Sequence, residues 1–384
     1  MKKNTYNKHN SFISLNSSKG EHSDNLIIKR IKKVFDKDKN LLTKYQTKIV
    51  ERAINDIEFN SGENKDKNKF QLFLNVKDEL ASFEDNQILK YIFHRYRYEI
   101  FPKSQELDNY PPYLQIEPSS ICNYRCVFCF MSDNSFNKKS QGYMGTMKLE
   151  LFKDVIDQAE NNVEFISLAS RGEPMAAQDI SKMLEYCVNK FLNLKINTNA
   201  SLLNEEKIHA ILKGGVKTLV FSADAADKEL YAKLRVNGKL DKVLKNIELF
   251  NNIKEKQYRN TNIITRVSGV KFNDEQNLDD MVKLWNGLVD QIAFVEYNPW
   301  ENSYQKETND ISNPCSDLWR RMFVWWDGII NPCDVDYKSK LNVGNFKNKS
   351  LKEAWNSEIY NRIREKHLNK SRNKLVPCNA CTVV

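Results

Sequence analysis

The stretch Cys122-Asn123-Tyr124-Arg125-Cys126-Val127-Phe128-Cys129 holds three cysteines in the spacing C-x3-C-x2-C, directly after the apolar run 113–117. Cysteine thiolates are the usual ligands of iron-sulfur clusters, and a four-iron cubane held by three thiolates keeps one iron without a protein ligand. The stretch therefore predicts a cluster with an open iron. A zinc site or three unrelated thiols are the alternatives, but zinc usually takes Cys or His pairs that close a tetrahedron locally. No fourth Cys or His stands near Cys129.

This spacing, with the aromatic Phe128 just before the third cysteine, resembles the radical S-adenosylmethionine (radical SAM) superfamily. The resemblance implies that Cys122, Cys126 and Cys129 hold a 4Fe-4S cluster whose open iron binds the amino and carboxylate groups of S-adenosyl-L-methionine (SAM). One electron from the cluster then cleaves SAM to a 5′-deoxyadenosyl radical, which abstracts hydrogen from a substrate. Reduced flavodoxin or ferredoxin is the electron donor that the resemblance implies.

Length and composition narrow the class of protein. The 384 residues fit one large α/β domain with appendages. No run of 18 apolar residues occurs, and residues 1–25 lack an apolar signal segment, so we expect a cytoplasmic protein rather than a membrane or secreted one. Eight cysteines in a reducing compartment favour metal ligation over disulfides. The net charge is +9, and the excess basic residues are distributed over Lys- and Asn-rich segments. Arginines do not cluster along one segment, so nucleic-acid binding is not expected.

The chain divides into four predicted parts. Residues 1–25 read as a disordered polar tail, and residues 26–110 as a helical extension with apolar residues at helical spacing. Strand-like and helix-like patterns alternate over residues 111–300, which predicts a parallel sheet with crossover helices. This α/β pattern matches the partial (β/α)6 TIM-type barrel that the resemblance implies, and residues 301–384 form a small C-terminal domain. The strands are expected at 113–117, 164–169, 194–197, 218–222, 262–267 and 292–297, and the helices at 148–160, 180–191, 205–213, 240–253 and 278–288.

Polar residues after successive strands are candidates for SAM binding, because ligands of parallel α/β folds gather at the carboxyl ends of the strands. The segment 170–174, Ser-Arg-Gly-Glu-Pro, resembles the Gly-Gly-Glu-Pro segment with which the family binds the SAM amino group, with Arg171 in place of the first glycine. Ordinary turn and N-cap chemistry is the alternative for the candidates at strand ends, and an exposed edge position is the alternative for Arg266. The cofactor contacts implied by the resemblance are Phe128, Gly172, Glu173, Thr198, Asn199, Ser222, Asp224 and Arg266.

Four further cysteines, Cys315, Cys333, Cys378 and Cys381, lie near the end of the chain. Their order, with a hairpin turn at Asp327-Gly328, resembles the SPASM/Twitch extension of radical SAM enzymes. The resemblance implies that these four cysteines fully ligate a second, auxiliary 4Fe-4S cluster that serves electron transfer. A zinc ribbon is the alternative. The remaining cysteine, Cys187, lies in an apolar pattern and is interpreted as a buried packing residue.

Asp334 directly follows Cys333. Its position matches an acid that serves as substrate base in sulfatase maturases of the SPASM group. A radical oxidation removes one hydrogen atom, one proton and one electron, so a carboxylate beside the auxiliary cluster can accept the proton. Asp336 and Asp327 compete for this role, and Asp334 could instead cap a turn.

These observations predict an oxygen-sensitive radical SAM oxidoreductase of the SPASM/Twitch group. We expect it to abstract hydrogen from a C–H bond of a small, carbohydrate-like substrate, with the auxiliary cluster accepting an electron. A maturase of a ribosomally made peptide is the alternative within the class. A non-catalytic zinc or iron-sulfur protein that binds nucleic acid is the alternative from another class. Cyclisation of GTP is disfavoured because the C-terminal Gly-Gly of that enzyme is missing here.

Overall fold

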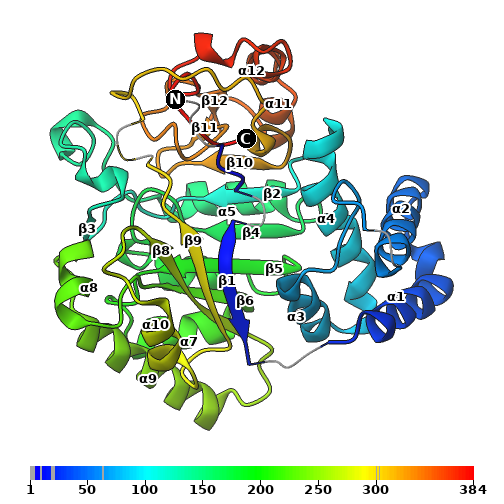
Figure 1. Cartoon of the computed structure of the whole chain (residues 1–384), viewed down its shortest axis with the longest axis horizontal. Coiled ribbons are helices and arrows are strands. Elements are labelled where there is room, and N and C mark those ends of the chain that lie inside the picture. The colour runs from blue at the N-terminus through cyan, green and yellow to red at the C-terminus, as the bar shows by residue number, and fades with distance from the viewer. Residues whose placement is uncertain (1–4, 9–10, 19–21, 63–64, 300, 302) are drawn as a thin grey trace.

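The described part of the chain folds around a single ten-stranded sheet in this computed structural model (Figure 1). The structure describes residues 5–8, 11–18, 22–62, 65–299, 301 and 303–384. The strands follow the order β1-β9-β8-β6-β5-β4-β2-β10-β11-β12 across the sheet. Their bounds are β1 (Phe12–Ser17), β9 (Gln291–Glu296), β8 (Ile264–Lys271), β6 (Val216–Ser222), β5 (Asn193–Thr198), β4 (Phe165–Leu168), β2 (Tyr113–Ile116), β10 (Arg321–Val324), β11 (Ile329–Asn331) and β12 (Gly344–Asn345).

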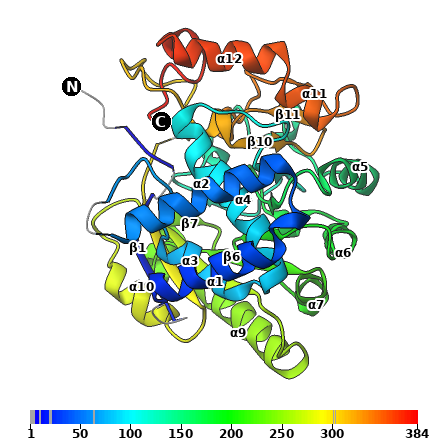
Figure 2. The same cartoon turned by 90° about the vertical axis from the view of Figure 1, so that its right-hand side faces the viewer.

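The predicted partial barrel is confirmed. Strands β2, β4, β5, β6, β8 and β9 are parallel neighbours in chain order. All residues of β2 and β4 are buried, as expected for parallel strands covered on both faces. Figure 2 shows several crossover helices stacked along one side of the sheet. The helices of this part are α5 (Leu149–Ala159), α6 (Ile180–Tyr186), α7 (Glu205–Lys213), α8 (Lys228–Leu234), α9 (Leu240–Gln257) and α10 (Leu278–Trp285).

Two local predictions in the barrel need correction. The helix expected over 180–191 ends at Tyr186, and Asn189 then adopts a φ of 59°, a left-handed conformation typical of a chain leaving a helix. The short helix α8 was missed, although Asp227 caps it by accepting a hydrogen bond from the Leu230 N–H at 2.7 Å. Cys187 is a buried core residue, as predicted.

The predicted disordered tail over residues 1–25 is wrong for its described part. Residues 12–17 form β1, which pairs antiparallel with β9, and Tyr6 forms a β-bridge with Val383. The other residues of the tail, 1–4, 9–10 and 19–21, lie outside the described residues. The composition suggested disorder, but an open edge strand offers unpaired backbone groups to any extended segment. The backbone of β1 therefore finds its hydrogen-bond partners on β9.

The helical extension is confirmed. It consists of α1 (Asp24–Asp38), α2 (Lys44–Ser61), α3 (Leu74–Ser82) and α4 (Asp85–Ser104), which share a hydrophobic core. Helix α4 is buried over most of its length and packs against Tyr113 and Phe165 of the sheet. Within the described residues, no helix is long and apolar enough to cross a membrane.

The C-terminal domain is attached to the barrel through the sheet itself. Strand β10 pairs in parallel with β2, so that Met322 lies opposite Leu114. The predicted hairpin at Asp327-Gly328 joins β10 to β11, and Gly328 has a φ of +88° that favours glycine. The chain then passes Cys333 and forms α11 (Leu351–Trp355) and α12 (Glu358–Leu368). This pairing brings the C-terminal cysteines close to the open end of the barrel.

Candidate functional site

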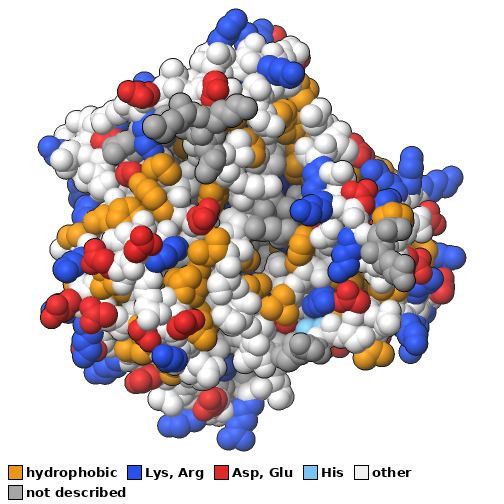
Figure 3. Space-filling model, viewed as in Figure 1, with side chains coloured by type: hydrophobic (Ala, Val, Ile, Leu, Met, Phe, Trp, Pro, Cys, Tyr) orange, Lys and Arg blue, Asp and Glu red, His pale blue; other side chains and the backbone are white. Residues whose placement is uncertain are grey.

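A cavity of about 420 Å³ lies at the carboxyl ends of the barrel strands and contains the first cysteine motif. Cys122, Cys126 and Cys129 all line it, because the loop after β2 folds back and forms β3 (Arg125–Cys126) against β7 (Arg235–Val236). On the face shown in Figure 3, Lys and Arg side chains are interspersed with Asp and Glu.

The three thiols suit an iron-sulfur cluster. Burial raises the pKa of Cys122 to about 12 and also raises the pKa values of Cys126 and Cys129. Two N–H donors already face the sulfurs: Tyr124 N lies 3.4 Å from Cys122 Sγ, and Arg235 Nη1 lies 3.8 Å from Cys126 Sγ. Buried thiolates need a nearby positive centre, and cluster iron supplies one. The donor set therefore fits the cluster that the spacing predicts.

Gly172 allows two chain segments to approach closely beside the cysteines. A Cβ at this position would lie 2.4 Å from Ser119 O and 2.5 Å from the Ser120 carbonyl carbon, both backbone atoms of the segment that leads to Cys122. Glu173 follows, and its backbone N–H donates to Ile121 O at 3.0 Å. The predicted Gly-Glu pair therefore positions the cysteine loop as well as lining the cavity.

Glu173 is the centre of a hydrogen-bond network that joins three strand ends. Its carboxylate accepts from Thr198 Oγ1 at 2.6 Å, Asn199 N at 2.7 Å and Met175 N at 3.1 Å. Burial raises the pKa of Glu173, and these three donors act in the opposite direction. The Asn199 side chain in turn donates to Asn123 Oδ1 at 3.0 Å, inside the cysteine motif. Thr198 and Asn199, at the end of β5, are thus linked to the cysteine motif through Glu173 and Asn123.

The replacement of the first glycine of the motif by Arg171 has a structural explanation. The guanidinium is 2% exposed and donates to both oxygens of Glu117, at 2.8 and 2.6 Å. It also donates to Tyr337 O at 2.9 Å and lies 4.3 Å from the Trp325 ring centroid. Arg171 therefore ties the barrel to the C-terminal domain, a role that glycine could not fill.

The remaining predicted cofactor contacts divide into two groups. Phe128 and Ser222 line the cavity, whereas Asp224 and Arg266 are buried outside its lining. Asp224 forms an ion pair with Arg235 and accepts a hydrogen bond from Val270 N at 2.7 Å. Arg266 donates to Gln291 Oε1 at 2.7 Å and lies over the Phe12 ring. The arginine beside the cysteines is Arg235, which sequence reasoning missed because it follows a helix that was not predicted.

The four C-terminal cysteines line a second, small and mainly apolar cavity. Burial raises the pKa values of all four thiols, that of Cys315 to about 11. Two fully buried N–H groups beside them, His367 Nε2 and Arg372 Nε, have no hydrogen-bond partner among the described residues. Buried donors without acceptors are rare. Four thiols and two free donors match a ligated cluster whose sulfurs accept hydrogen bonds, so the residues fit the auxiliary cluster.

Family comparisons agree with this geometry. The model of the radical SAM superfamily matches residues 116–284, and that of the SPASM iron-sulfur cluster-binding domain matches residues 315–382. The chain belongs to the radical SAM superfamily. It is an enzyme of the SPASM subgroup, and it uses a SAM-binding 4Fe-4S cluster and an auxiliary iron-sulfur cluster.

Known proteins similar to this radical SAM enzyme include a nucleotide cyclase and a protein with a bound precursor peptide. The GTP 3′,8-cyclase of Clostridium botulinum (strain Okra) is 28% identical over 215 residues, which cover 54% of this chain and 64% of the relative. The chain thus matches less than two thirds of the length of the first curated relatives. Streptococcus suis SuiB bound to its precursor peptide SuiA shares the fold with a TM-score of 0.52 and 17% identity, over 94% of this chain and 87% of SuiB. The enzyme anSMEcpe with bound AdoMet also gives a TM-score of 0.52 at 17% identity, over 70% and 88% of the two chains.

Lys8 and Asp334 connect the two cavities of this radical SAM enzyme. Lys8 lines both cavities, and its ammonium lies 2.9 Å from Asp317 and 2.6 Å from Asp334. Burial disfavours the charge of Lys8, but the two carboxylates hold its pKa above the ordinary range. Asp334 also lines the main cavity, as its predicted role requires. Sequence reasoning missed Lys8, since no local motif marks it.

The two competing carboxylates have structural roles. Asp336 is fully buried, and it accepts hydrogen bonds from Tyr304, Lys340 N and Leu341 N. Asp327 accepts from Ile329 N at 3.1 Å in the hairpin turn. Neither residue lines the main cavity. Of the three candidates, Asp334 is therefore the carboxylate that a substrate in this cavity could reach.

Proposed function

We propose that this enzyme oxidises a small, carbohydrate-like molecule at a C–H bond in the main cavity, with Asp334 as the proton acceptor. The observation that carries the proposal is the position of Asp334, which lines the cavity of the cysteine triad and directly follows a cysteine of the second cavity. A proton acceptor can serve the oxidation only where the substrate lies within reach of both the cysteine triad and the second cysteine site. Asp334 lies at such a point.

The size and border of the cavity support a small substrate. Its volume of about 420 Å³ lies in the range of ordinary small-molecule sites, and SAM must share it with the substrate. Tyr6, Lys8 and Ser11, from the segment that leads into β1, form part of its wall.

Different residues of the chain bind different parts of SAM in this proposal. We infer that Arg235, held by Asp224 beside Cys126, binds the SAM carboxylate in place of Arg266. Glu173, Thr198 and Asn199 fix the loops that surround the SAM amino group, and Phe128 and Ser222 border the same space. Such pre-arranged groups orient SAM before reaction and keep water away.

The chemistry of the bound groups and that of the chain are complementary. When bound, the SAM-binding cluster with SAM and the auxiliary cluster supply hydrogen-atom abstraction and the uptake of one electron. Oxidation of an alcohol to a carbonyl also releases the hydroxyl proton. Asp334 Oδ1 already accepts from Lys8, so Oδ2 is the oxygen we assign to that proton. We propose reduced flavodoxin or ferredoxin as electron donor and the cytoplasm as the compartment, because none of the eight cysteines forms a disulfide.

The test uses anaerobically reconstituted enzyme and a panel of amino sugars, cyclitols and short peptides. We expect a sugar or cyclitol to stimulate 5′-deoxyadenosine release and to be oxidised. Asp334→Asn should lower product formation by about 10²- to 10⁴-fold, whereas the exposed control Asp274→Asn should not. Stimulation by peptides alone would instead support a peptide-modifying enzyme. Unchanged turnover in Asp334→Asn would refute the assigned base.

A further inference from the structure

One cation that lines the main cavity forms no ion pair with the described residues. The cationic side chains that line the cavity are Lys8, Arg171, Lys195, Arg235 and Arg321. Within the described part of the chain, Lys8 forms ion pairs with Asp317 and Asp334, and Arg171 forms one with Glu117. Arg235 pairs with Asp224, and Arg321 pairs with Asp317. The Lys195 ammonium has neither a hydrogen bond nor an ion pair to the described residues. A partly buried cation without a partner is costly unless a ligand supplies the anion.

Lys195 stands in a polar row on the cavity floor. It lies on β5 opposite Ser167 of β4, and Ser167 lies opposite Gln115 of β2. All three side chains line the cavity. Neighbouring strands are about 4.8 Å apart, so an amide, a hydroxyl and an ammonium stand side by side. This row, Gln115-Ser167-Lys195, offers the donors that an oxyanion accepts.

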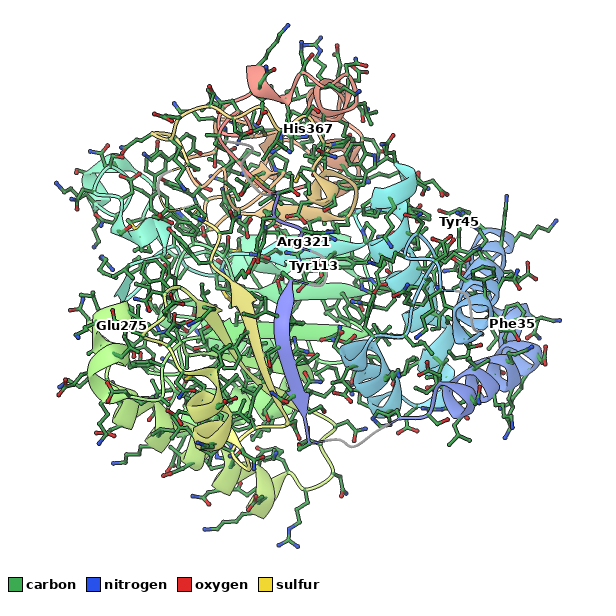
Figure 4. All side chains as sticks on the ribbon, in the orientation of Figure 1. Phe35, Tyr45, Tyr113, Glu275, Arg321 and His367 are labelled. Carbon is green, nitrogen blue, oxygen red and sulfur yellow. The ribbon has the colours of Figure 1, made fainter. Side chains whose placement is uncertain are left out.

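The surroundings of Lys195 are electropositive. Burial and the charges of Arg266 and Arg321 together lower the pKa of Lys195 to about 7, although Glu79 acts in the opposite direction. Arg321 reaches the same region from β10, where its guanidinium lies 5.2 Å from the Tyr113 ring centroid. Figure 4 shows Arg321 and Tyr113 close together at the junction of the sheet and the C-terminal domain. An anion bound on the floor would relieve this concentration of positive charge.

The floor is separate from the place we assign to SAM. Thr198, which contacts Glu173 at the SAM end, comes three residues after Lys195 on β5. This spacing corresponds to about 10 Å along the strand. Arg235, beside Cys126, is the residue that we assign to the SAM carboxylate. Lys195 is therefore left for a group of the substrate.

We propose that Lys195, with Gln115 and Ser167, binds an oxyanion of the substrate, a carboxylate or a phosphate ester. The substrate is then an anionic small molecule, such as a sugar acid or a sugar phosphate, held about 10 Å from the SAM end. The inference rests on the proposed function, since it assigns the charge of the substrate in that same cavity. It adds a binding site to the floor of the barrel.

The test measures anion binding rather than turnover. Acetate and inorganic phosphate are titrated by calorimetry into cluster-loaded enzyme saturated with SAM, in buffer without other oxyanions. The variants are Lys195→Met, Lys195→Arg and, as matched control, Lys213→Met at an exposed position on α7. Iron content and thermal unfolding show that each variant is folded, and Lys195→Gln replaces Lys195→Met if that variant is not.

We expect one saturable site per chain in the wild type and in Lys213→Met. Lys195→Met should weaken it at least tenfold, and Lys195→Arg should retain it because the charge is kept. Tighter acetate indicates a carboxylate substrate, and tighter phosphate a phosphate ester. No saturable binding in the wild type, equal affinity in Lys195→Met, or loss in Lys195→Arg would each overturn the proposal. Failure of the wild type to release 5′-deoxyadenosine from SAM would refute the proposed function, but it would not contradict the proposed anion site.

Discussion

The two cysteine sites differ in their surroundings as much as in their number of ligands. The triad opens into a cavity of about 420 Å³ with polar and charged walls. The four C-terminal cysteines instead enclose a small cavity with apolar walls such as Leu318, Val335 and Leu341. An open iron needs room for a ligand, whereas a fully ligated cluster needs only exclusion of water and hydrogen bonds to its sulfurs. This difference supports our proposal that substrate chemistry takes place at the first site and electron transfer at the second.

The largest expected effect separates the two sites directly. Cys126→Ala should lose about four irons and all release of 5′-deoxyadenosine from SAM. Cys333→Ala should lose a similar amount of iron yet still cleave SAM without a substrate, because the triad is intact. Iron and sulfide analysis, electron paramagnetic resonance and chromatography of 5′-deoxyadenosine report these outcomes. If Cys333→Ala kept the triad cluster but lost SAM cleavage, the division between the sites would be wrong.

The second prediction concerns the arginine that marks the triad site. Arg235→Met removes the partner of the fully buried Asp224 and should destabilise the protein by about 3–5 kcal/mol. It should also weaken SAM binding at least tenfold. Arg235→Met combined with Asp224→Asn removes the uncompensated charge, so stability should return while SAM affinity stays low. Chemical denaturation and equilibrium dialysis with SAM measure the two effects. Recovery of SAM affinity in the double variant would show that Arg235 only supports the fold.

Sequence motifs located many of the residues that line the two cavities, because the residues of each motif are neighbours in the chain. The seven cysteines, Gly172, Glu173, Thr198 and Asn199 line the cavities where the motifs place them. Contacts between distant segments were not predictable in this way. Lys8 meets Asp334 across 326 positions, and His367 meets Cys315 across 52. Arg266 was misplaced because the sequence around an arginine in a strand does not show which neighbouring group its guanidinium will contact.

The third prediction tests how tightly the triad loop is built. Gly172→Ala would place a methyl group 2.4 Å from Ser119 O, and backbone cannot move away as a flexible side chain can. We expect a loss of about 1–3 kcal/mol of stability and reduced iron retention at the triad. Gly62→Ala is the control, because the nearest atom to its Cβ is 3.4 Å away. Differential scanning calorimetry of the anaerobic proteins should show a lower Tm only for Gly172→Ala. Equal behaviour of the two variants would mean that the loop tolerates the displacement.

The smallest effect concerns hydrogen bonding at the closed site. Cys315 N donates to His367 Nδ1 at 3.1 Å, so the ring proton lies on Nε2, which has no partner among the described residues. Because His367 lines the cavity of the four cysteines and its Nε2 is buried without a partner among the described residues, we expect Nε2 to donate to a sulfur of the auxiliary cluster. Such a bond stabilises the reduced, more negative state. Its loss is worth about 1 kcal/mol, or about 40 mV for a one-electron couple.

A pair of variants isolates this bond. In His367→Asn the amide oxygen can replace Nδ1 as acceptor for Cys315 N, but the donor at Nε2 is gone. In His367→Gln the amide nitrogen can replace Nε2 as donor. Redox titration followed by electron paramagnetic resonance should give a more negative auxiliary potential for His367→Asn than for His367→Gln, with the triad potential unchanged in both. Equal auxiliary potentials would show that His367 positions Cys315 alone. Arg372 Nε would then be the remaining buried donor for a sulfur at the site of the four C-terminal cysteines.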